Sequence, residues 1–253
     1  MDTSKIAAQL YTVRNFARTE NEVYETLKKI KEIGFNAVQI SGIAKVEPKK
    51  LKNFLDEFAL EVCATHISFD VLKNNINDVI NEHHILECKH IAVPSMPNEY
   101  KNKEDYLKFA EELNKLGKIL SENSITLSYH NHSFELEKFD GITGLEIIYD
   151  NTDPQFVKAE IDTFWIQHGG ASVSMWLKKL IDRMDIIHLK DMAIKNGKQV
   201  MSEIGNGNLN WEEILSICKQ ANIEWYIIEQ DDDFVDPFES LKISLNYLKA
   251  LNI

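Results

Sequence analysis

The chain has 253 residues, of which 44% are hydrophobic, and this is enough apolar material for one large globular core. Its formal net charge of -12 argues against nucleic acid or an anionic membrane surface as a partner, because both are negatively charged. Cys63, Cys88 and Cys218 are too few and too irregularly spaced for a disulfide framework or a cysteine zinc module, so we expect them reduced in the core.

The N-terminal segment lacks a charged region followed by a long apolar stretch. No run approaches the roughly 18 apolar residues that a membrane-spanning helix needs. We therefore expect a cytoplasmic protein without a membrane partner.

Short apolar runs alternate with longer segments of helical period along the whole chain, which is typical of repeated βα units. In chain order, strands are expected at residues 6–11, 37–41, 61–68, 90–96, 125–132, 157–164, 185–191 and 224–230. Eight such units in about 250 residues is the usual size of a (β/α)8 barrel. We predict an α/β protein in which residues 1–253 form a single TIM-barrel domain. A doubly wound sheet is disfavoured because no glycine-rich phosphate loop follows the first strand, where the sequence reads QLYTVRNFA.

Local signals mark several helix ends. Gly34 is expected to end the first helix, and Pro48, Asn210 and Pro237 are expected at the starts of later ones. The stretch 141–151 predicts only a short helix.

Polar residues recur where the predicted strands end, and the C-terminal ends of barrel strands meet at one rim. These residues are Gln9, Gln39, His66, Pro94, His130, His132, Asp162, His188, Lys190, Glu229 and Gln230. Because side chains alternate along a strand, His130 and His132 share one face, as do His188 and Lys190. Carboxylates and neutral imidazoles together suit a divalent transition metal. The candidates for holding such an ion are His130, His132, Asp162, His188 and Glu229.

Five segments carry a resemblance to a known family: QLYTVR, YHNHSFELE, EIDTFW, HLKDM and SEIGNGNLNW. With them the chain resembles, over its whole length, the sugar phosphate isomerase/epimerase group with a xylose isomerase-like TIM barrel. That group includes ketose 3-epimerases, inosose dehydratase and endonuclease IV. Its members usually place Glu, Asp, His and Glu at four strand ends as metal ligands. By position, the resemblance implies that His130, Asp162, His188 and Glu229 hold one divalent ion.

The chain departs from this pattern at His130, where the family usually has glutamate. In the epimerases, the two glutamates are ligands and also the pair that moves a proton between the two faces of the sugar. With one of them replaced, His132, Glu135, His66 and Glu203 remain open as substitutes. A site richer in nitrogen favours Mn, Co, Fe or Zn over Mg.

A ketone polarised by a divalent ion has a more acidic adjacent C–H bond. Glu229 is our preferred general base, and Asp162 and His188 are expected to act only as ligands. The further catalytic candidates are His66, His132 and Lys190, and the substrate-binding candidates are Gln9, Gln39, Trp165 and Glu135. Purely structural interpretations stand beside these: Lys190 and Asp191 as an ion pair at the rim, Trp176 and Trp211 as packing residues, and His83 and His84 as surface residues.

Three enzyme functions follow from the resemblance. The first is a metal-dependent isomerase or epimerase of a keto sugar or sugar phosphate. The second is a dehydratase or lyase for inosose or 3-keto-glycoside substrates, in which one base and one acid suffice. Endonuclease IV-like DNA repair is disfavoured by the charge of -12, and a non-catalytic binding protein stays open because fold does not fix function. The expected partner is a small sugar, and a homo-oligomer is possible. The scarcity of cations at the rim, beyond Lys190 and Arg14, favours an unphosphorylated sugar.

Overall fold

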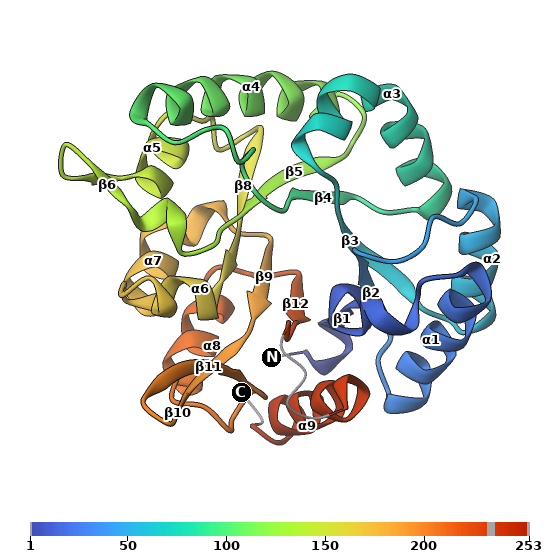
Figure 1. Ribbon diagram of the computed structural model, residues 1–253. Helices are drawn as coiled ribbons and strands as arrows, with labels where there is room; N and C mark the ends of the chain where they lie inside the picture. Colours follow the sequence, from blue (N-terminus) through green and yellow to red (C-terminus); the bar gives the residue numbers. More distant parts are fainter. Residues whose placement is uncertain (1, 232–235, 252–253) are drawn as a thin grey trace.

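The computed structural model describes residues 2–231 and 236–251. In this part of the chain, eight parallel strands close into a barrel in the order β1-β12-β9-β8-β5-β4-β3-β2 (Figure 1). The barrel strands are β1 (Ile6–Gln9), β2 (Ala37–Ile40), β3 (Glu61–His66), β4 (His90–Val93), β5 (Thr126–His130), β8 (Val157–Asp162), β9 (Ile186–Leu189) and β12 (Trp225–Ile228). The predicted (β/α)8 barrel is confirmed, and each strand is shorter than the apolar run that predicted it.

Helices surround the barrel (Figure 1). They are α1 (Glu20–Ile33), α2 (Pro48–Glu57), α3 (Phe69–Leu86), α4 (Lys103–Ser121), α5 (Gly144–Asp150), α6 (Thr163–His168), α7 (Val173–Lys179), α8 (Trp211–Gln220) and α9 (Pro237–Ala250). Short 3-10 helices lie at Thr3–Lys5, Leu10–Phe16, Phe134–Leu136 and Ile181–Arg183. The predicted ends are confirmed: Gly34 is the left-handed C-cap of α1, and the Asn210 side chain accepts a hydrogen bond from the backbone of Glu213 at the start of α8.

The core has two layers because side chains alternate along each strand. Ile6 and Ala8 belong to the large apolar cluster that the helices cover, whereas Ala7 belongs to a separate small cluster with Ala37, Cys63, Ala64, Ile186, Trp225 and Ile227. Gln9 and Gln39 follow Ala7 and Ala37 two residues later on the same strands. Gln9 and Gln39 therefore lie on the same side of the strands as this small cluster. They are nearer to the C-terminal strand ends, where the polar rim begins.

Two antiparallel hairpins extend the loops at the C-terminal ends of the strands, and neither was predicted. One is β6 (Lys138–Phe139) with β7 (Ile142–Thr143), and the other is β10 (Asp191–Lys195) with β11 (Lys198–Ser202). The carboxylate of Asp191 secures the second one, because it accepts hydrogen bonds from the backbone of Gly205 and Gly207 and from the indole Nε1 of Trp211. The predicted ion pair between Lys190 and Asp191 is wrong, since Lys190 pairs with other carboxylates.

The three cysteines, Trp176, Trp211 and His83 are all buried. All three cysteines are free and buried, and Trp176 and Trp211 are packed in the core. His83 was expected at the surface and is instead buried, where its ring bonds Thr65 and the backbone oxygen of Val79. Within the described residues, the helices lack the length and apolar character needed to cross a membrane.

Candidate active site

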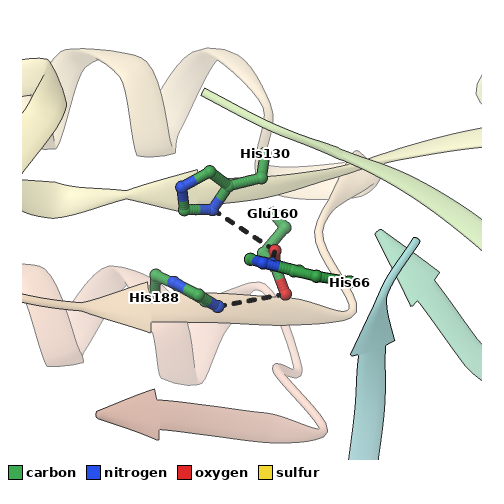
Figure 2. A group of neighbouring side chains, drawn as sticks. All are labelled: His66, His130, Glu160 and His188. Carbon is green, nitrogen blue, oxygen red and sulfur yellow. Dashed lines mark hydrogen bonds and ion pairs between the residues drawn. The ribbon is translucent and has the colours of Figure 1, made fainter. Parts of the chain in front are cut away.

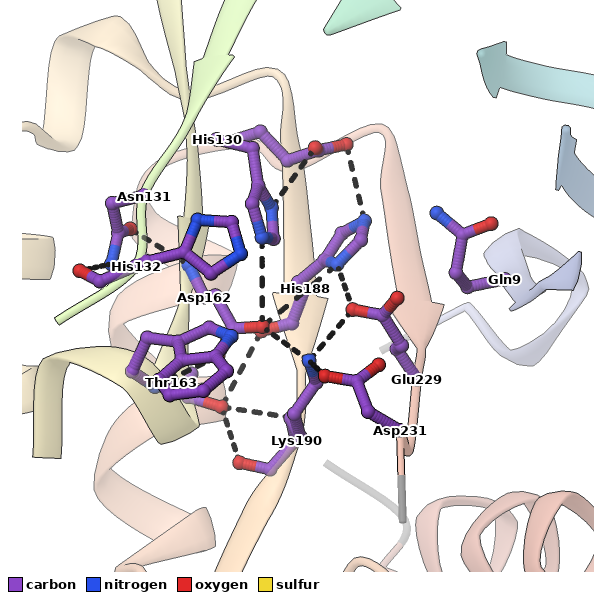
Figure 3. Close-up of polar contacts among 12 residues, drawn as sticks. Gln9, His130, Asn131, His132, Asp162, Thr163, His188, Lys190, Glu229 and Asp231 are labelled. Atoms are coloured by element: carbon purple, nitrogen blue, oxygen red, sulfur yellow. Dashed lines mark hydrogen bonds and ion pairs between the residues drawn. The ribbon is translucent and has the colours of Figure 1, made fainter. Parts of the chain in front are cut away.

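The four predicted metal ligands come together at the C-terminal rim of the barrel. His130 and Asp162 end β5 and β8, His188 lies in β9 beside Asp162 in the strand register, and Glu229 directly follows β12. One donor atom from each lies within 4.8 Å of the others, and all four side chains are buried. Figure 3 shows three ion-pair contacts among them: His188 Nδ1 to Glu229 Oε2 at 3.0 Å, His130 Nε2 to Asp162 Oδ2 at 3.9 Å, and His188 Nδ1 to Asp162 Oδ2 at 4.0 Å.

These residues fit a divalent ion in chemistry and spacing. Two donors that are each about 2.1 Å from one ion lie at most about 4.2 Å apart. The contacts of 3.0, 3.9 and 4.0 Å lie within this limit, and all the donor atoms lie within 4.8 Å of one another. Asp162 Oδ2 is buried and accepts no hydrogen bond from the described residues, although Lys190 forms an ion pair with it. Two carboxylates with two imidazoles suit Mn, Fe, Co or Zn. The cluster could therefore hold a metal ion, and which metal it takes stays a prediction.

Lys190 lies at the centre of the carboxylates. Its Nζ is 2.8 Å from Glu229 Oε2, 3.1 Å from Asp162 Oδ2 and 3.0 Å from Asp231 Oδ2 (Figure 3). Burial alone would lower the pKa of this ammonium, but the charges of Asp162, Glu229 and Asp231 outweigh it and raise the pKa well above its usual value. Lys190 is therefore a buried side chain that carries a positive charge at neutral pH.

Glu229 and His188 are charged partners in the protein without metal. Burial opposes ionisation of Glu229, but Lys190 and His188 outweigh it and hold the pKa of Glu229 well below its usual range. Burial also opposes protonation of His188, yet Glu160 and Glu229 raise its pKa to about 10. His130 differs, because burial and the nearby His188 hold its pKa well below the usual value. One of the two imidazoles is therefore protonated and the other neutral.

Glu160 belongs to the site and was missed by the sequence reasoning. It is fully buried, and its carboxylate lies among the rings of His66, His130 and His188 (Figure 2). Burial would raise its pKa, but His188 and His66 outweigh that and hold the pKa well below its usual range. The signal was available, because Glu160 precedes Asp162 by two residues and alternation puts both on the same face of β8.

A cavity of about 470 Å³ opens over this cluster. Its lining residues are Tyr11, Arg14, Ser41, His66, Pro94, Ser95, His130, His132, Trp165, Lys190, Glu229 and Asp231. All four predicted catalytic residues and Trp165 are among them. Asp231, which was not predicted, follows Glu229 by two residues. In the described part of the chain, His132 Nδ1, Trp165 Nε1 and Asp231 Oδ1 are buried without a hydrogen-bond partner.

The other predicted site residues lie beside the cavity and not in its lining. Gln9 Nε2 donates to Gln39 Oε1, and Gln39 Nε2 donates to Glu160 Oε1. Glu135 is occupied by the Tyr129 hydroxyl and the backbone of His132. Gln9, Gln39 and Glu135 do not line the cavity, and their polar atoms bond other groups of the protein. Their predicted contacts with substrate are therefore not supported.

Glu203 does not reach the metal cluster. Its carboxylate accepts hydrogen bonds from the Ser240 hydroxyl at 2.9 Å and from Asn206 at 3.3 Å. Among the described residues, Glu203 is therefore not part of a cluster that could hold a metal ion.

Known proteins are similar to this chain in sequence or in fold. An inosose dehydratase from Bacillus anthracis is 25% identical over 261 aligned positions, which cover 87% of this chain and 86% of that protein. A solved sugar phosphate isomerase/epimerase from Parabacteroides distasonis has a TM-score of 0.80 at 21% identity and covers 98% of this chain and 95% of its own. An L-ribulose 3-epimerase structure has a TM-score of 0.72 at 14% identity, with 97% of this chain and 93% of its own covered.

The two structural likenesses concern the fold. The sequence profile of the family described as xylose isomerase-like TIM barrel matches residues 27–251. This match spans most of the chain and agrees with the closed barrel. The chain belongs to the xylose isomerase-like TIM barrel family.

Proposed function

We propose that this protein is a metal-dependent enzyme that removes a proton from the carbon next to the carbonyl group of a keto sugar or keto cyclitol. This step is common to isomerases, epimerases and dehydratases. The observation that carries the proposal is the position of Glu229: an ionised carboxylate that lines the cavity and lies beside His130, Asp162 and His188.

His130, Asp162, His188 and Glu229 would hold one divalent ion, with Mn, Co, Zn and Fe as the candidates. When bound, such an ion supplies Lewis acidity, which polarises a carbonyl group and makes the adjacent C–H bond more acidic. The carboxylates of Asp162 and Glu229 would balance its charge.

Glu229 is the proposed base, because its pKa lies well below neutrality and it is ionised when the substrate arrives. Lys190 orients it through the 2.8 Å ion pair. The same ammonium lines the cavity and can stabilise negative charge that develops on a substrate oxygen.

The unpartnered groups of the cavity fit a ligand rich in hydroxyl groups. Buried polar atoms in proteins nearly always have a partner. Trp165 Nε1 can only donate and an ionised Asp231 Oδ1 can only accept, whereas a hydroxyl group does both. His132 Nδ1 adds a third such position. A polyol ring or chain would satisfy all three.

The reaction after proton removal is an elimination or an epimerisation. An epimerase needs a second acid/base group across the substrate. Among the described residues, the carboxylates of the lining are Glu229 and Asp231, which both follow strand β12, whereas the lining contributed by the ends of β3 and β5 carries the imidazoles of His66, His130 and His132. This one-sided arrangement and the inosose dehydratase relative favour elimination of water or of a glycosidic oxygen. Epimerisation with His66 or His132 as the second group is the alternative.

Proton exchange tests the step that both outcomes share. The protein loaded with Mn or Co is incubated in D2O with keto sugars and inosose, and deuterium at the carbon next to the carbonyl is followed by NMR. Exchange that disappears in Glu229→Gln supports the proposal. An unsaturated product identifies elimination, and an inverted centre identifies epimerisation. Metal-loaded protein that exchanges no proton of any such substrate would contradict the proposed function.

A further inference from the structure

Glu160 lies on the opposite side of the two imidazole ligands from Asp162 and Glu229. Its Oε2 is 2.8 Å from His66 Nε2 and 3.3 Å from His130 Nδ1 (Figure 2). Its Oε1 is 3.3 Å from His188 Nε2 and accepts a hydrogen bond of 2.7 Å from Gln39 Nε2. One buried carboxylate therefore contacts both imidazoles of the proposed metal site.

The two imidazoles turn opposite nitrogens toward Glu160. His130 directs Nδ1 toward Glu160 and Nε2 toward Asp162. His188 directs Nε2 toward Glu160 and Nδ1 toward Asp162 and Glu229. A ring nitrogen that faces a carboxylate carries a hydrogen, whereas a nitrogen that binds a metal ion must present a lone pair. Which nitrogen is available on each ring thus depends on what Glu160 accepts.

A second contact indicates that the Nε2 of His188 carries a hydrogen. Its Nε2 is also 2.5 Å from Gln39 Oε1, and Gln39 Nε2 is committed as a donor to Glu160. Two acceptors face the Nε2 of His188, so this nitrogen carries a hydrogen. Gln9, which lies in β1, also donates a hydrogen bond to Oε1 of Gln39. This contact fixes which end of the Gln39 amide is the oxygen.

We propose that Glu160 is a positioning residue for the metal centre: its carboxylate lies 3.3 Å from His130 Nδ1 and 3.3 Å from His188 Nε2, favours a hydrogen on both of these nitrogens, and thereby presents His130 Nε2 and His188 Nδ1 as ligands. This inference rests on the proposed metal dependence. Partners of this kind behind metal-bound imidazoles fix the ring tautomer, and their loss typically weakens metal binding by about 10- to 100-fold.

A competing arrangement makes Glu160 itself a ligand. His66, His130, Glu160 and His188 also offer donor atoms within 4.8 Å of one another. That set contains one carboxylate and would turn His130 Nε2 and His188 Nδ1 away from the ion. It would also leave Asp162 and Glu229 outside the coordination of the ion, as partners of Lys190 and of the imidazoles. The charge of a divalent ion is better balanced by the set that includes both of these carboxylates.

Glu160→Gln separates the two arrangements. Glutamine keeps the shape but offers one acceptor oxygen and one NH2 group. It can accept from one imidazole and must donate to the other, which then turns its hydrogen toward the ligand side. We expect the variant to bind one Mn or Zn per chain with an affinity about 10- to 100-fold lower, measured by competition with a chelator.

Glu135→Gln is the matched control, because Glu135 is equally buried and contacts neither imidazole ligand. Its metal affinity should equal that of the wild type. A second measurement needs no metal: ¹⁵N NMR of the metal-free protein should show a hydrogen on Nδ1 of His130, and Glu160→Gln should change the protonation pattern of the His130 or His188 ring.

The outcomes are distinct. Wild-type protein that binds none of Mn, Co, Zn and Fe overturns the proposed function and this inference with it. If the wild type binds metal and Glu160→Gln binds it equally well, only the inference fails. Complete loss of bound metal in Glu160→Gln makes Glu160 a ligand and also overturns the positioning role. If the variant does not fold, a hydrogen on Nε2 of His130 in the wild-type spectrum still refutes it.

Discussion

The Nζ of Lys190 lies 2.8 Å from Oε2 of Glu229 and is almost completely buried. It is also shared with Asp162 and Asp231, so one ammonium serves three carboxylates at the place where a divalent ion would bind. In the metal-free protein, Lys190 therefore neutralises part of the charge that a metal ion would otherwise balance. Stability and metal binding should be linked through this residue.

We predict that Lys190→Met destabilises the metal-free protein by about 3–5 kcal/mol, because removal of one partner leaves buried charges uncompensated. Added Mn should restore much of this loss, since a ligand that binds only the folded state stabilises it. Thermal unfolding in EDTA and in Mn measures both effects. Equal losses with and without metal would show that Lys190 and the ion do not share the carboxylates.

Metal binding should release about one proton at neutral pH, because ligand nitrogens must be deprotonated. The pKa of His188 is raised to about 10, so this ring is protonated at pH 7 when no metal is bound, whereas the lowered pKa of His130 leaves that ring neutral. Below pH 10, affinity should therefore rise with pH, by up to about tenfold per unit.

Titration calorimetry in buffers of different ionisation enthalpy at pH 7 counts this proton, and chelator competition at pH 6, 7 and 8 gives the slope. The sign is fixed by the competition at His188, because a proton on Nδ1 and a metal ion exclude each other. An affinity that stays constant over this range would contradict ligation by His188.

Glu229→Gln should lower the rate of proton exchange by about 10²- to 10⁴-fold at saturating metal, the range typical of a general base. It should also weaken metal binding, because a ligand is lost. Glu203→Gln is a suitable control: this carboxylate is engaged by Ser240 and Asn206, so the exchange rate should stay unchanged. If Glu229→Gln exchanges protons as fast as the wild type, another residue is the base.

The sequence alone predicted the barrel because alternating apolar runs and helical segments are a local pattern. It also brought His130, Asp162, His188 and Glu229 to one rim, since strand ends are recognisable and a parallel barrel collects them. Glu160 was within reach of the same reasoning, since the alternation applied to His130 and His132 holds for Glu160 and Asp162.

Other features could not be read from the sequence. The role of Gln39 depends on the distance across the barrel between β2 and β8, which strand spacing along the chain does not give. The engagement of Lys190 by three carboxylates depends on loop geometry beyond β12, where Asp231 lies. The burial of His83 depends on the side of α3 that packs against Thr65 of β3.

Trp165→Phe tests whether the cavity recognises hydroxyl groups through the unpartnered indole N–H. Phenylalanine keeps an aromatic ring and removes the donor, so a lost hydrogen bond of about 0.5–1.5 kcal/mol should lower kcat/KM by about 2- to 10-fold. Metal affinity should not change. The effect should fall mainly on KM if the contact forms equally in the bound substrate and in the transition state.

Trp211→Phe is the matched control for the loss of an indole N–H. Its Nε1 donates to Asp191 at 2.7 Å and secures the loop after β11, away from the cavity lining. This variant should lower the unfolding temperature and leave the KM of the folded protein unchanged. Steady-state kinetics and thermal unfolding of both variants decide the matter: an unchanged KM in Trp165→Phe would remove Trp165 from substrate recognition and leave its ring as a wall of the cavity.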